Sequence, residues 1–573
     1  MLKAKVQAAV ASEGSPLVAQ EQPAAAPAAA KDEGLRRIGC FMGGVLDDYR
    51  RRSRYLVSDW TDGFSRKTIP AALFMFFATF TSTVALGEHM NRESHGKLGV
   101  TEYLLMNSIS GVAYAFFGCQ PYVVLRPTGP ITLLILEIYL IADSFSLDFY
   151  RLLANTGLWV GVLMLVIAGL ELSRFITKLT RFSHDIFAFF VCTIYIGDGV
   201  VGVSHRLSDA ASKGFKGDAL LALNFALLVV ILALWFNSVG STVFFTRTLR
   251  DAIVSYALTL SVALVSALAN IYTRSVDHAD DQPDDNATGF DIMYIHIPSP
   301  FGPTTERSWW VGLAPLGAEL GVGFLAAVPI VIFFYLDQNI SSLLTQTPDM
   351  NLAKGVYYHS SILMMGIFNV LGPMFGLPFV TGSLPHSPQF VLAMRDDSSA
   401  QSGSKKGAHV VETRLAALIC YALIGASLAV PELIGMLPTA TVEGTLCFVG
   451  FHGLQHTQLW ERTILLFTEP ALFPRPYASL GPKVVHGYTM VQLFCWAMCW
   501  VVNLTLGLAF PAWIVLLIPI RAYLLPNLFT EAQLEALDAE DEVASQLTEA
   551  QMNALMGSLS RARSKHEKWK GGA

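Results

Sequence analysis

Long apolar stretches recur along almost the whole chain, and this repetition restricts the fold more than any other feature of the sequence. A helix needs about 20 apolar residues to cross the roughly 30 Å hydrocarbon layer of a bilayer. Clear stretches of this kind lie near residues 68–87, 101–120, 154–173, 185–203, 218–237, 249–271, 311–336, 356–376, 411–431 and 484–505. Shorter ones, broken by Gly and Pro, lie near residues 127–142, 383–394, 437–455 and 509–525. The sequence therefore predicts an all-α polytopic membrane protein with about 14 transmembrane segments.

The composition agrees with a protein that lies in a lipid bilayer. Of the 573 residues, 53% are hydrophobic and only 15% are charged, whereas soluble proteins carry about 25% charged residues. The formal net charge of −6 supplies no basic field for a nucleic acid. These values disfavour a soluble multidomain enzyme, a disordered scaffold and a nucleic-acid binder. The seven cysteines form no CxxC pair and no cluster with histidine, so we expect no disulfide framework, no metal site and no cofactor.

Positive charge sets the expected orientation. The basic residues of segment 50–54 precede the first span, and cytosolic loops are the ones that collect Arg and Lys. Alternating the spans from there puts both termini in the cytosol, as a largely disordered tail over 1–66 and a second tail over 527–573. The loop 273–310 is then extracellular, and it is acidic and contains a glycosylation sequon at Asn286. We expect an integral, multi-pass protein of the plasma membrane.

Two segments in corresponding positions of the two halves are dense in Pro and Gly. Residues 120–130 contain three prolines and one glycine, and residues 376–388 contain three prolines and two glycines. Each segment follows a long predicted helix and opens a short one. Paired interrupted segments of this kind indicate an inverted-repeat transporter and mark its substrate site. Because seven spans per half is an odd number, the second half must enter the membrane inverted.

The breaks predict a site for an anion. A half-helix that begins inside the membrane leaves its first N–H groups unpaired and carries a partial positive charge there, so two facing ends can hold an anion. Arg126 adds a fixed charge, and His386 adds a group that titrates near neutrality. The alternatives are simple proline kinks and a His386 satisfied by hydrogen bonds. The candidate substrate-binding residues are Arg126, Thr128, Gly129, Pro130, Thr381, Ser383, Leu384, His386 and Ser387.

Ionisable residues in or beside the spans are the candidates for ion coupling, because charge is costly there and is usually functional. Asp337 follows the apolar run 328–335 and could bind a cation or a proton. The alternative for Asp337 is a solvated helix end at the membrane interface. Glu88 and Glu137 lie near other segment ends and are second-rank candidates. We expect Asp337 to couple transport to Na⁺ or H⁺, with Glu88 as the second candidate for this role.

A series of short signatures gives the chain a resemblance to a known family. They lie, in order, at residues 99–102, 118–121, 128–130, 181–189, 336–340, 376–378, 518–521 and 537–541. Together they resemble the bicarbonate and borate transporters of solute carrier family four, which include the band-three anion exchangers and the plant and fungal borate exporters. The resemblance covers about residues 40 to 545, which is most of the chain.

The resemblance implies a secondary-active transporter of inorganic anions, not an enzyme. It implies 14 spans in a seven-plus-seven inverted repeat and a homodimer. A core domain over 67–174 and 311–431 would move like an elevator against a gate domain over 175–272 and 432–526. The anion would lie between the starts of the third and tenth spans.

The substrate is not decided by the resemblance. Band-three-like exchangers carry an arginine near the start of span ten, where this chain has His386, and the segment 385–388 is closer to borate exporters. The segments 128–130 and 181–189 are closer to the bicarbonate branch. On the span-ten match and the short N-terminal region, borate is slightly favoured, with bicarbonate as the alternative, by chloride exchange or sodium coupling. An integral-membrane enzyme built on His184 and Asp185 is a remote alternative.

Overall fold

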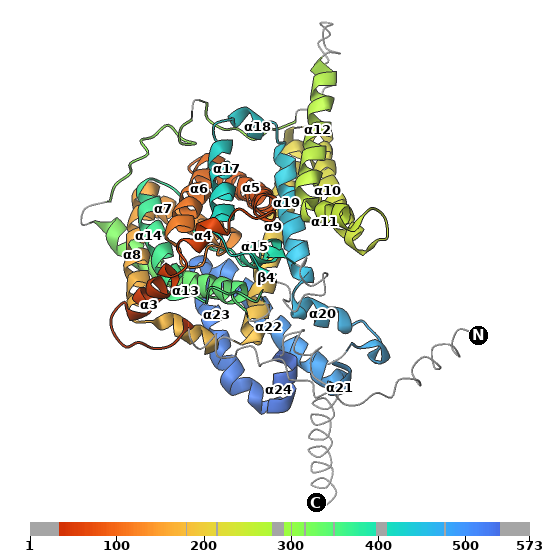
Figure 1. Ribbon diagram of the computed structural model, residues 1–573. Coiled ribbons are helices and arrows are strands. Elements are labelled where there is room, and N and C mark those ends of the chain that lie inside the picture. The colour runs from red at the N-terminus through yellow and green to blue at the C-terminus, as the bar shows by residue number, and fades with distance from the viewer. Residues whose placement is uncertain are drawn as a thin grey trace, which may run out of the picture.

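The computed structural model describes residues 34–178, 180–213, 216–277, 292–299, 301–313, 317–347, 350–396, 409–474 and 477–538. Regular structure in these ranges is almost entirely helical, and the named strands are two-residue segments in two antiparallel pairs. Figure 1 shows the helices packed into one body, with α10, α11 and α12 standing together at one side. The predicted all-α fold class is confirmed.

One group of helices repeats the same order in the two halves of the chain. The first half supplies α5 (Thr68–Glu93), α6 (Val100–Phe117), β1 (Leu125–Arg126), α7 (Gly129–Ser144) and α8 (Phe149–Gly169). The second half supplies α13 (Ala318–Thr345), α14 (His359–Met374), β2 (Thr381–Gly382), α15 (His386–Ala393) and α17 (Leu415–Ser427). Helix α6 packs on α17, and its counterpart α14 packs on α8. This exchange of partners between the halves is the packing expected of an inverted repeat.

A second group of helices packs mainly on itself. It contains α9 (Arg181–Lys213), α10 (Lys216–Ser238), α11 (Arg247–Ser255), α12 (Ala257–Asp277), α18 (Pro431–Gly435), α19 (Thr439–Gln455), α20 (Gln458–Leu465), α21 (Tyr477–Leu480), α22 (Pro482–Leu506) and α23 (Phe510–Pro519). Helix α19 lies between α9 and α10, and α22 packs on α9. Below we call the first group the core and the second group the gate, and their division into two moving domains stays a prediction.

Proline and glycine end the helices at the two breaks. After α14, Gly376 has a φ of +66°, a left-handed conformation that glycine adopts without a steric penalty. The N–H of Leu377 then donates to the carbonyl of Gly372 at 3.0 Å, which closes the end of the helix. After α6, the chain runs through Pro121 and Pro127, which cannot donate a backbone hydrogen bond, before α7 begins.

Every predicted span contains a helix, but the number of membrane crossings stays a prediction. Among the described helices, six are long and apolar enough to cross a bilayer, or seven if α11 and α12, bent by 71°, form one span. Others, such as α7 with 16 residues and α15 with 8, are too short to cross alone. The predicted end of the span 311–336 differs from the structure, because α13 continues to Thr345 and carries Asp337 in its interior. Asp337 is therefore not a solvated helix end.

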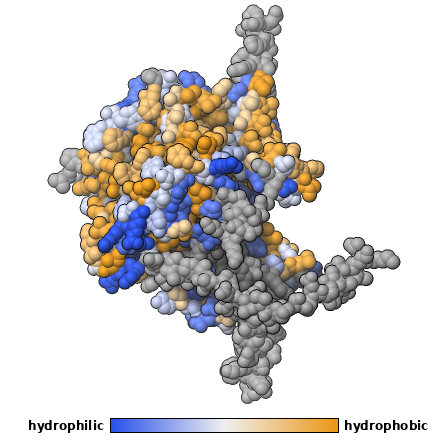
Figure 2. All heavy atoms as spheres, viewed as in Figure 1, coloured by the Kyte–Doolittle hydropathy of each residue, from blue (hydrophilic) through white to orange (hydrophobic). Residues whose placement is uncertain are grey.

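Large apolar side chains cover much of the visible surface (Figure 2). Leu325 is 70% exposed, Phe494 64% and Trp235 59%. Exposure of contiguous apolar surface would be unfavourable in water, whereas lipid chains solvate it without cost. The surface therefore agrees with a protein that lies in a bilayer.

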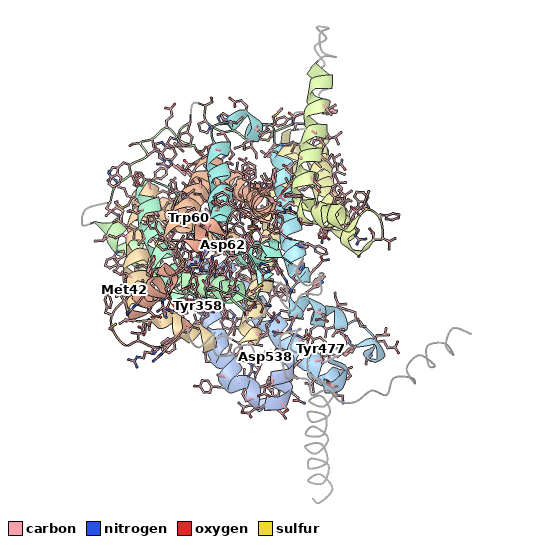
Figure 3. The ribbon with its side chains drawn as sticks, viewed as in Figure 1. Met42, Trp60, Asp62, Tyr358, Tyr477 and Asp538 are labelled. Carbon is pink, nitrogen blue, oxygen red and sulfur yellow. The ribbon has the colours of Figure 1, made fainter. Side chains whose placement is uncertain are left out.

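Two helices lie within the segment predicted as an N-terminal tail. These are α3 (Gly43–Ser53) and α4 (Ser58–Thr61), which together we call the N-terminal layer. Figure 3 labels Trp60 and Asp62 in this segment, and Tyr358 at the start of α14. The second strand pair is formed by β3 (Arg395–Asp396) and β4 (His409–Val410), with Arg395 opposite Val410 and Asp396 opposite His409. At the other end of the chain, α24 (Glu531–Asp538) is anchored by the Asp538 carboxylate, which pairs with Arg521 at 2.7 Å. Of the tail predicted to be largely disordered over 1–66, residues 1–33 lie outside the described residues, as does the sequon at Asn286.

Candidate functional site

The two broken segments meet in the core group. Strands β1 and β2 pair antiparallel, with Leu125 opposite Gly382 and Arg126 opposite Thr381. The N–H of Ser383 also donates to the carbonyl of Val124 at 2.8 Å. Because α7 begins directly after β1 and α15 directly after β2, this pairing brings the starts of both helices to one place. The candidate residues at the two breaks, which are far apart in sequence, therefore share one site.

The start of α7 is built by Thr128, Gly129 and Pro130. Thr128 takes the N-cap position in extended conformation, and its carbonyl accepts the first helical hydrogen bond from the N–H of Thr132 at 3.0 Å. Its hydroxyl does not cap the helix and has no hydrogen-bond partner among the described residues, although Thr128 is buried. The N–H of Gly129 donates to the phenol oxygen of Tyr195, from α9, at 2.8 Å. The start of α7 thus presents a buried hydroxyl and a polarised helix end.

The start of α15 is held together by short-range hydrogen bonds. The Ser383 hydroxyl and Nδ1 of His386 lie 2.8 Å apart. The Ser387 hydroxyl accepts from the N–H of Val124 at 2.9 Å and lies 2.9 Å from the hydroxyl of Ser341 on α13. Ser387 therefore joins β1, α13 and α15. Leu384 is half-buried and packs at the edge of the apolar core.

Arg126 is the positive charge of this site. Its side chain is 2% exposed, and its Nη1 donates to the carbonyl of Thr79 at 3.2 Å and to the hydroxyls of Ser82 and Thr83, all on α5. Its Nε has no partner among the described residues. His386 and Tyr195 both lie within electrostatic range of the guanidinium. A buried guanidinium with an unused donor can bind an anion by a charge-assisted hydrogen bond.

Asp337 places a carboxyl group on another side of the same site. It is 4% exposed on α13, its side chain lies beside the hydroxyl of Thr381, and Tyr195 is within electrostatic range. The next residue, Gln338, approaches β2 closely: a Cβ on Gly382 would lie 2.9 Å from Oε1 of Gln338. Only glycine fits at position 382 without a shift of these atoms. Arg126 and Asp337 therefore bring a guanidinium and a carboxyl group to the two helix starts.

The two glutamates of the predicted coupling set lie elsewhere. Glu88 is half-buried toward the end of α5, six residues or about 9 Å of helix beyond Ser82, and it accepts a hydrogen bond from Asn91 at 3.4 Å. Glu137 lies in α7, two turns beyond its start, against Gly507. Of the predicted coupling residues, the structure brings only Asp337 to the helix starts.

Several residues at the site were missed by sequence reasoning. Ser82 and Thr83 belong to a run of hydroxyl side chains inside an apolar span, and Ser341 follows Asp337 by one turn. Such polar positions within a span are a usable signal, because an apolar layer tolerates them only with partners. Tyr195 gave no such signal, since an aromatic residue in an apolar helix is ordinary core material.

A family model described as "HCO3- transporter integral membrane domain" matches residues 40–213 and 203–542. The chain belongs to this family. Among the relatives of this bicarbonate transporter family member, the band 3 anion transport protein of Rattus norvegicus is 26% identical over 534 residues, covering 89% of this chain and 56% of the relative. Anion exchange protein 3 of Danio rerio is 25% identical, covering 89% and 45%. The chain thus spans about half the length of the curated relatives it matches.

Solved structures support the same fold. Murine solute carrier 26 family member A9 in the inward-facing state has a TM-score of 0.53 and 13% identity, covering 90% of this chain and 77% of that one. A second structure, described as the overall structure of the same transporter, gives a TM-score of 0.50 and 11% identity. This family member is therefore a multi-pass membrane protein with the architecture of anion transporters.

Proposed function

We propose that the protein is a secondary-active transporter of small inorganic monoanions, with bicarbonate ahead of borate. The observation that supports this most directly is the β1–β2 pair, which joins two helix starts to one buried arginine. Helix N-termini and a guanidinium both favour a compact, oxygen-rich anion. The description of the family model, an HCO3- transporter domain, favours bicarbonate over borate, and the relatives' names, anion transport and anion exchange, agree with an anion as the substrate.

Borate remains the second candidate because of one local feature. The segment 385–388 places His386 rather than an arginine at the start of α15, in a pattern that resembles borate exporters. In this protein the positive charge instead comes from Arg126 on β1. A site of backbone N–H groups, hydroxyls and one guanidinium accepts either anion, so flux measurements are needed to distinguish borate from bicarbonate as the substrate.

We further propose that Asp337 couples the anion to a cation. An ionised Asp337 cancels the charge of Arg126, so the site carries little net charge and binds an anion weakly. A proton or Na⁺ at Asp337 removes the negative charge and leaves Arg126 to attract the anion. The core group would then shift against the gate group with anion and cation bound. We also propose that the protein forms a homodimer in the plasma membrane, with both termini in the cytosol and a glycan at Asn286.

Flux into vesicles tests the function. Purified protein is reconstituted, and uptake of bicarbonate, borate and chloride is compared with and without a Na⁺ or H⁺ gradient. We expect bicarbonate flux to exceed borate flux and to respond to one of the gradients. A protein that moves none of these anions would contradict the proposal, and borate flux above bicarbonate flux would reverse its order.

The Asp337 variants test the coupling. We expect Asp337→Ala to abolish transport, and Asp337→Asn, which mimics the protonated carboxyl, to retain anion binding but lose the response to the cation gradient. Asp143→Ala, at an exposed aspartate near the end of α7, is the matched control and should keep full flux. Gradient-dependent flux in both Asp337 variants would remove Asp337 from the coupling role.

A further inference from the structure

Tyr195 lies at the contact between the gate and the anion site. It belongs to α9, which packs on α19, α10 and α22 of the gate group. Its phenol oxygen nevertheless accepts the N–H of Gly129, the first residue of α7 in the core group, at 2.8 Å. The contact is close enough that a Cβ on Gly129 would lie 2.5 Å from Cζ of the tyrosine ring. Glycine at position 129 is required for this approach.

The hydrogen bond between Gly129 and Tyr195 uses one of the few free backbone N–H groups at the start of α7. The first turn of α7 consists of Gly129, Pro130 and Ile131, and the N–H of Thr132 is already taken by the carbonyl of Thr128. Proline has no N–H, so the helix start offers two backbone donors to an anion, from Gly129 and Ile131. The phenol occupies one of these two. An anion that binds at the start of α7 must therefore replace the phenol or bind with fewer hydrogen bonds.

The same face of α9 touches the core group again one turn later. Asp198 lies 3.8 Å from Nε2 of His89 on α5. Tyr195 and Asp198 are three residues apart, so both point from one side of the gate helix toward the core. A displacement of the core by one helical turn, about 5.4 Å, exceeds the length of any hydrogen bond and would separate Tyr195 from Gly129.

From this geometry we propose that Tyr195 competes with the transported anion for the Gly129 amide. In the conformation described here the gate supplies the phenol oxygen to the start of α7, and movement of the core frees the amide for the anion. Tyr195 is thus a positioning residue that links anion affinity to the relative position of core and gate. The inference rests on the proposed function, because it presupposes an anion at the start of α7.

Tyr195→Phe tests the competition directly. The variant keeps the ring that packs against Gly129 but removes the oxygen. Because a hydrogen bond of this kind contributes about 0.5–1.5 kcal/mol, we expect the KM for bicarbonate uptake to fall roughly 2- to 10-fold, with a smaller change in kcat. If the phenol were instead a ligand of the anion, KM would rise by a similar factor. An unchanged or raised KM would overturn the inference.

Tyr103→Phe is the matched control. Tyr103 is a fully buried core tyrosine on α6 whose hydroxyl donates to the side chain of Thr132 on α7 at 3.0 Å. Removing the Tyr103 hydroxyl alters a contact of α7 without freeing a backbone N–H, so KM should stay at the wild-type value. A fall of KM in both variants would show a general loosening of α7 and would contradict a specific role for Tyr195.

A second pair of variants guards against loss of folding. Gly129→Ala places a methyl group against the Tyr195 ring and should lower the amount of folded protein or its flux, whereas Gly129→Ala combined with Tyr195→Ala removes the clash and should restore folded protein.

The affinity of Tyr195→Phe for bicarbonate can also be measured without a flux assay, from the melting temperature at increasing bicarbonate concentration. We expect bicarbonate to raise the melting temperature of Tyr195→Phe more than that of wild type. Absence of bicarbonate flux in wild type contradicts the proposed function, whereas wild-type flux with no gain in affinity in Tyr195→Phe contradicts this inference alone.

Discussion

Arg126 shows what one buried side chain contributes to the site. A guanidinium in an apolar layer is costly unless its donors are used, and here three α5 acceptors hold Nη1 while Nε stays unpaired among the described residues. The protein thus places a fixed positive charge beside two helix starts. The hydrogen bonds to α5 therefore hold the guanidinium in place.

We predict that Arg126→Gln weakens anion transport through KM. Glutamine retains a donor for the α5 acceptors but loses the charge, and a hydrogen bond to a charged group contributes about 1.5–3 kcal/mol. The KM for bicarbonate should therefore rise roughly 10- to 100-fold. Arg151→Gln, at an exposed arginine near the start of α8, is the control and should leave KM unchanged. Wild-type kinetics in Arg126→Gln would exclude it from the site.

Asp48 outside the spans gives a prediction about pH. It is fully buried on α3, accepts the N–H of Ser360 at 2.9 Å, and pairs with Arg51 at 2.9 Å. Burial raises the pKa of Asp48 to about 7 from its ordinary value of 3.8, against the opposing effects of Ser360 and Arg51. The surrounding titratable groups are Asp47, Tyr49, Arg51, Cys119 and Tyr358.

The folded state therefore keeps a proton at pH values where the unfolded chain has released it. Stability consequently falls as pH rises from about 4 to about 7, because the folded state binds more protons in this window. We predict that Asp48→Asn flattens this decline, measured as melting temperature against pH in detergent. Asp47→Asn, at a partly exposed neighbour, should leave the decline in place. An equal slope in wild type and Asp48→Asn would contradict the raised pKa.

The residues of the site were only partly accessible to sequence reasoning. The breaks at 120–130 and 376–388 could be found because Pro and Gly leave a visible mark in an apolar background. Ser387 was predicted to bind substrate, and the structure shows its hydroxyl engaged with Val124 and Ser341, a long-range contact that no local pattern reveals. Tyr195 could not be found, since its role depends on the packing of α9 against α7.

At the scale of elements, a buried charge cluster fastens the N-terminal layer to the core. Asp59, fully buried in α4, pairs with Arg52 at 2.6 Å, Arg414 at 2.9 Å and Lys354 at 3.2 Å. These three cations come from α3 and from the links that precede α17 and α14. The cluster therefore joins the start of the chain to segments about 300 residues away in sequence.

We predict that Asp59→Asn destabilises the protein severely. Removing the central carboxylate takes a partner from three buried cations, Arg52, Arg414 and Lys354, and leaves Arg52 with only Glu412 at 3.7 Å among its carboxylate partners in the described residues. Breaking a buried ion pair in this way costs about 3–5 kcal/mol. Asp62→Asn, at a neighbour 46% exposed that also pairs with Lys354, should have a small effect. Melting of the purified protein and the yield of folded protein measure both. Equal stability of the two variants would show that burial of the cluster contributes little.

At the scale of the whole molecule, the length of the apolar runs predicts where helices form, but not where each helix ends or with which helices it packs. All predicted spans contain helices, because apolar runs of this length have few alternatives in a bilayer. Their ends differ where sequence offers no stop signal: α13 runs on past Asp337 through a polar run that is buried, from Gln338 to Ser342. The apolar runs alone do not assign helices to core and gate, because that assignment depends on long-range packing; the predicted assignment comes from the resemblance to a known family.

One ion pair joins the core group to the gate group directly, and the proposed movement of core against gate would have to break it. Arg92 at the end of α5 in the core pairs with Glu443 of α19 in the gate, with Nη1 3.0 Å from Oε1. Arg92 is 29% exposed and Glu443 only 2%, so solvent weakens the pair and its contribution is about 1 kcal/mol. Arg92→Glu and Glu443→Arg should each lower the melting temperature and change turnover, whereas the double variant, which restores opposite charges, should recover most of both. A simple sum of the two single effects in the double variant would show that the pair does not hold core and gate together.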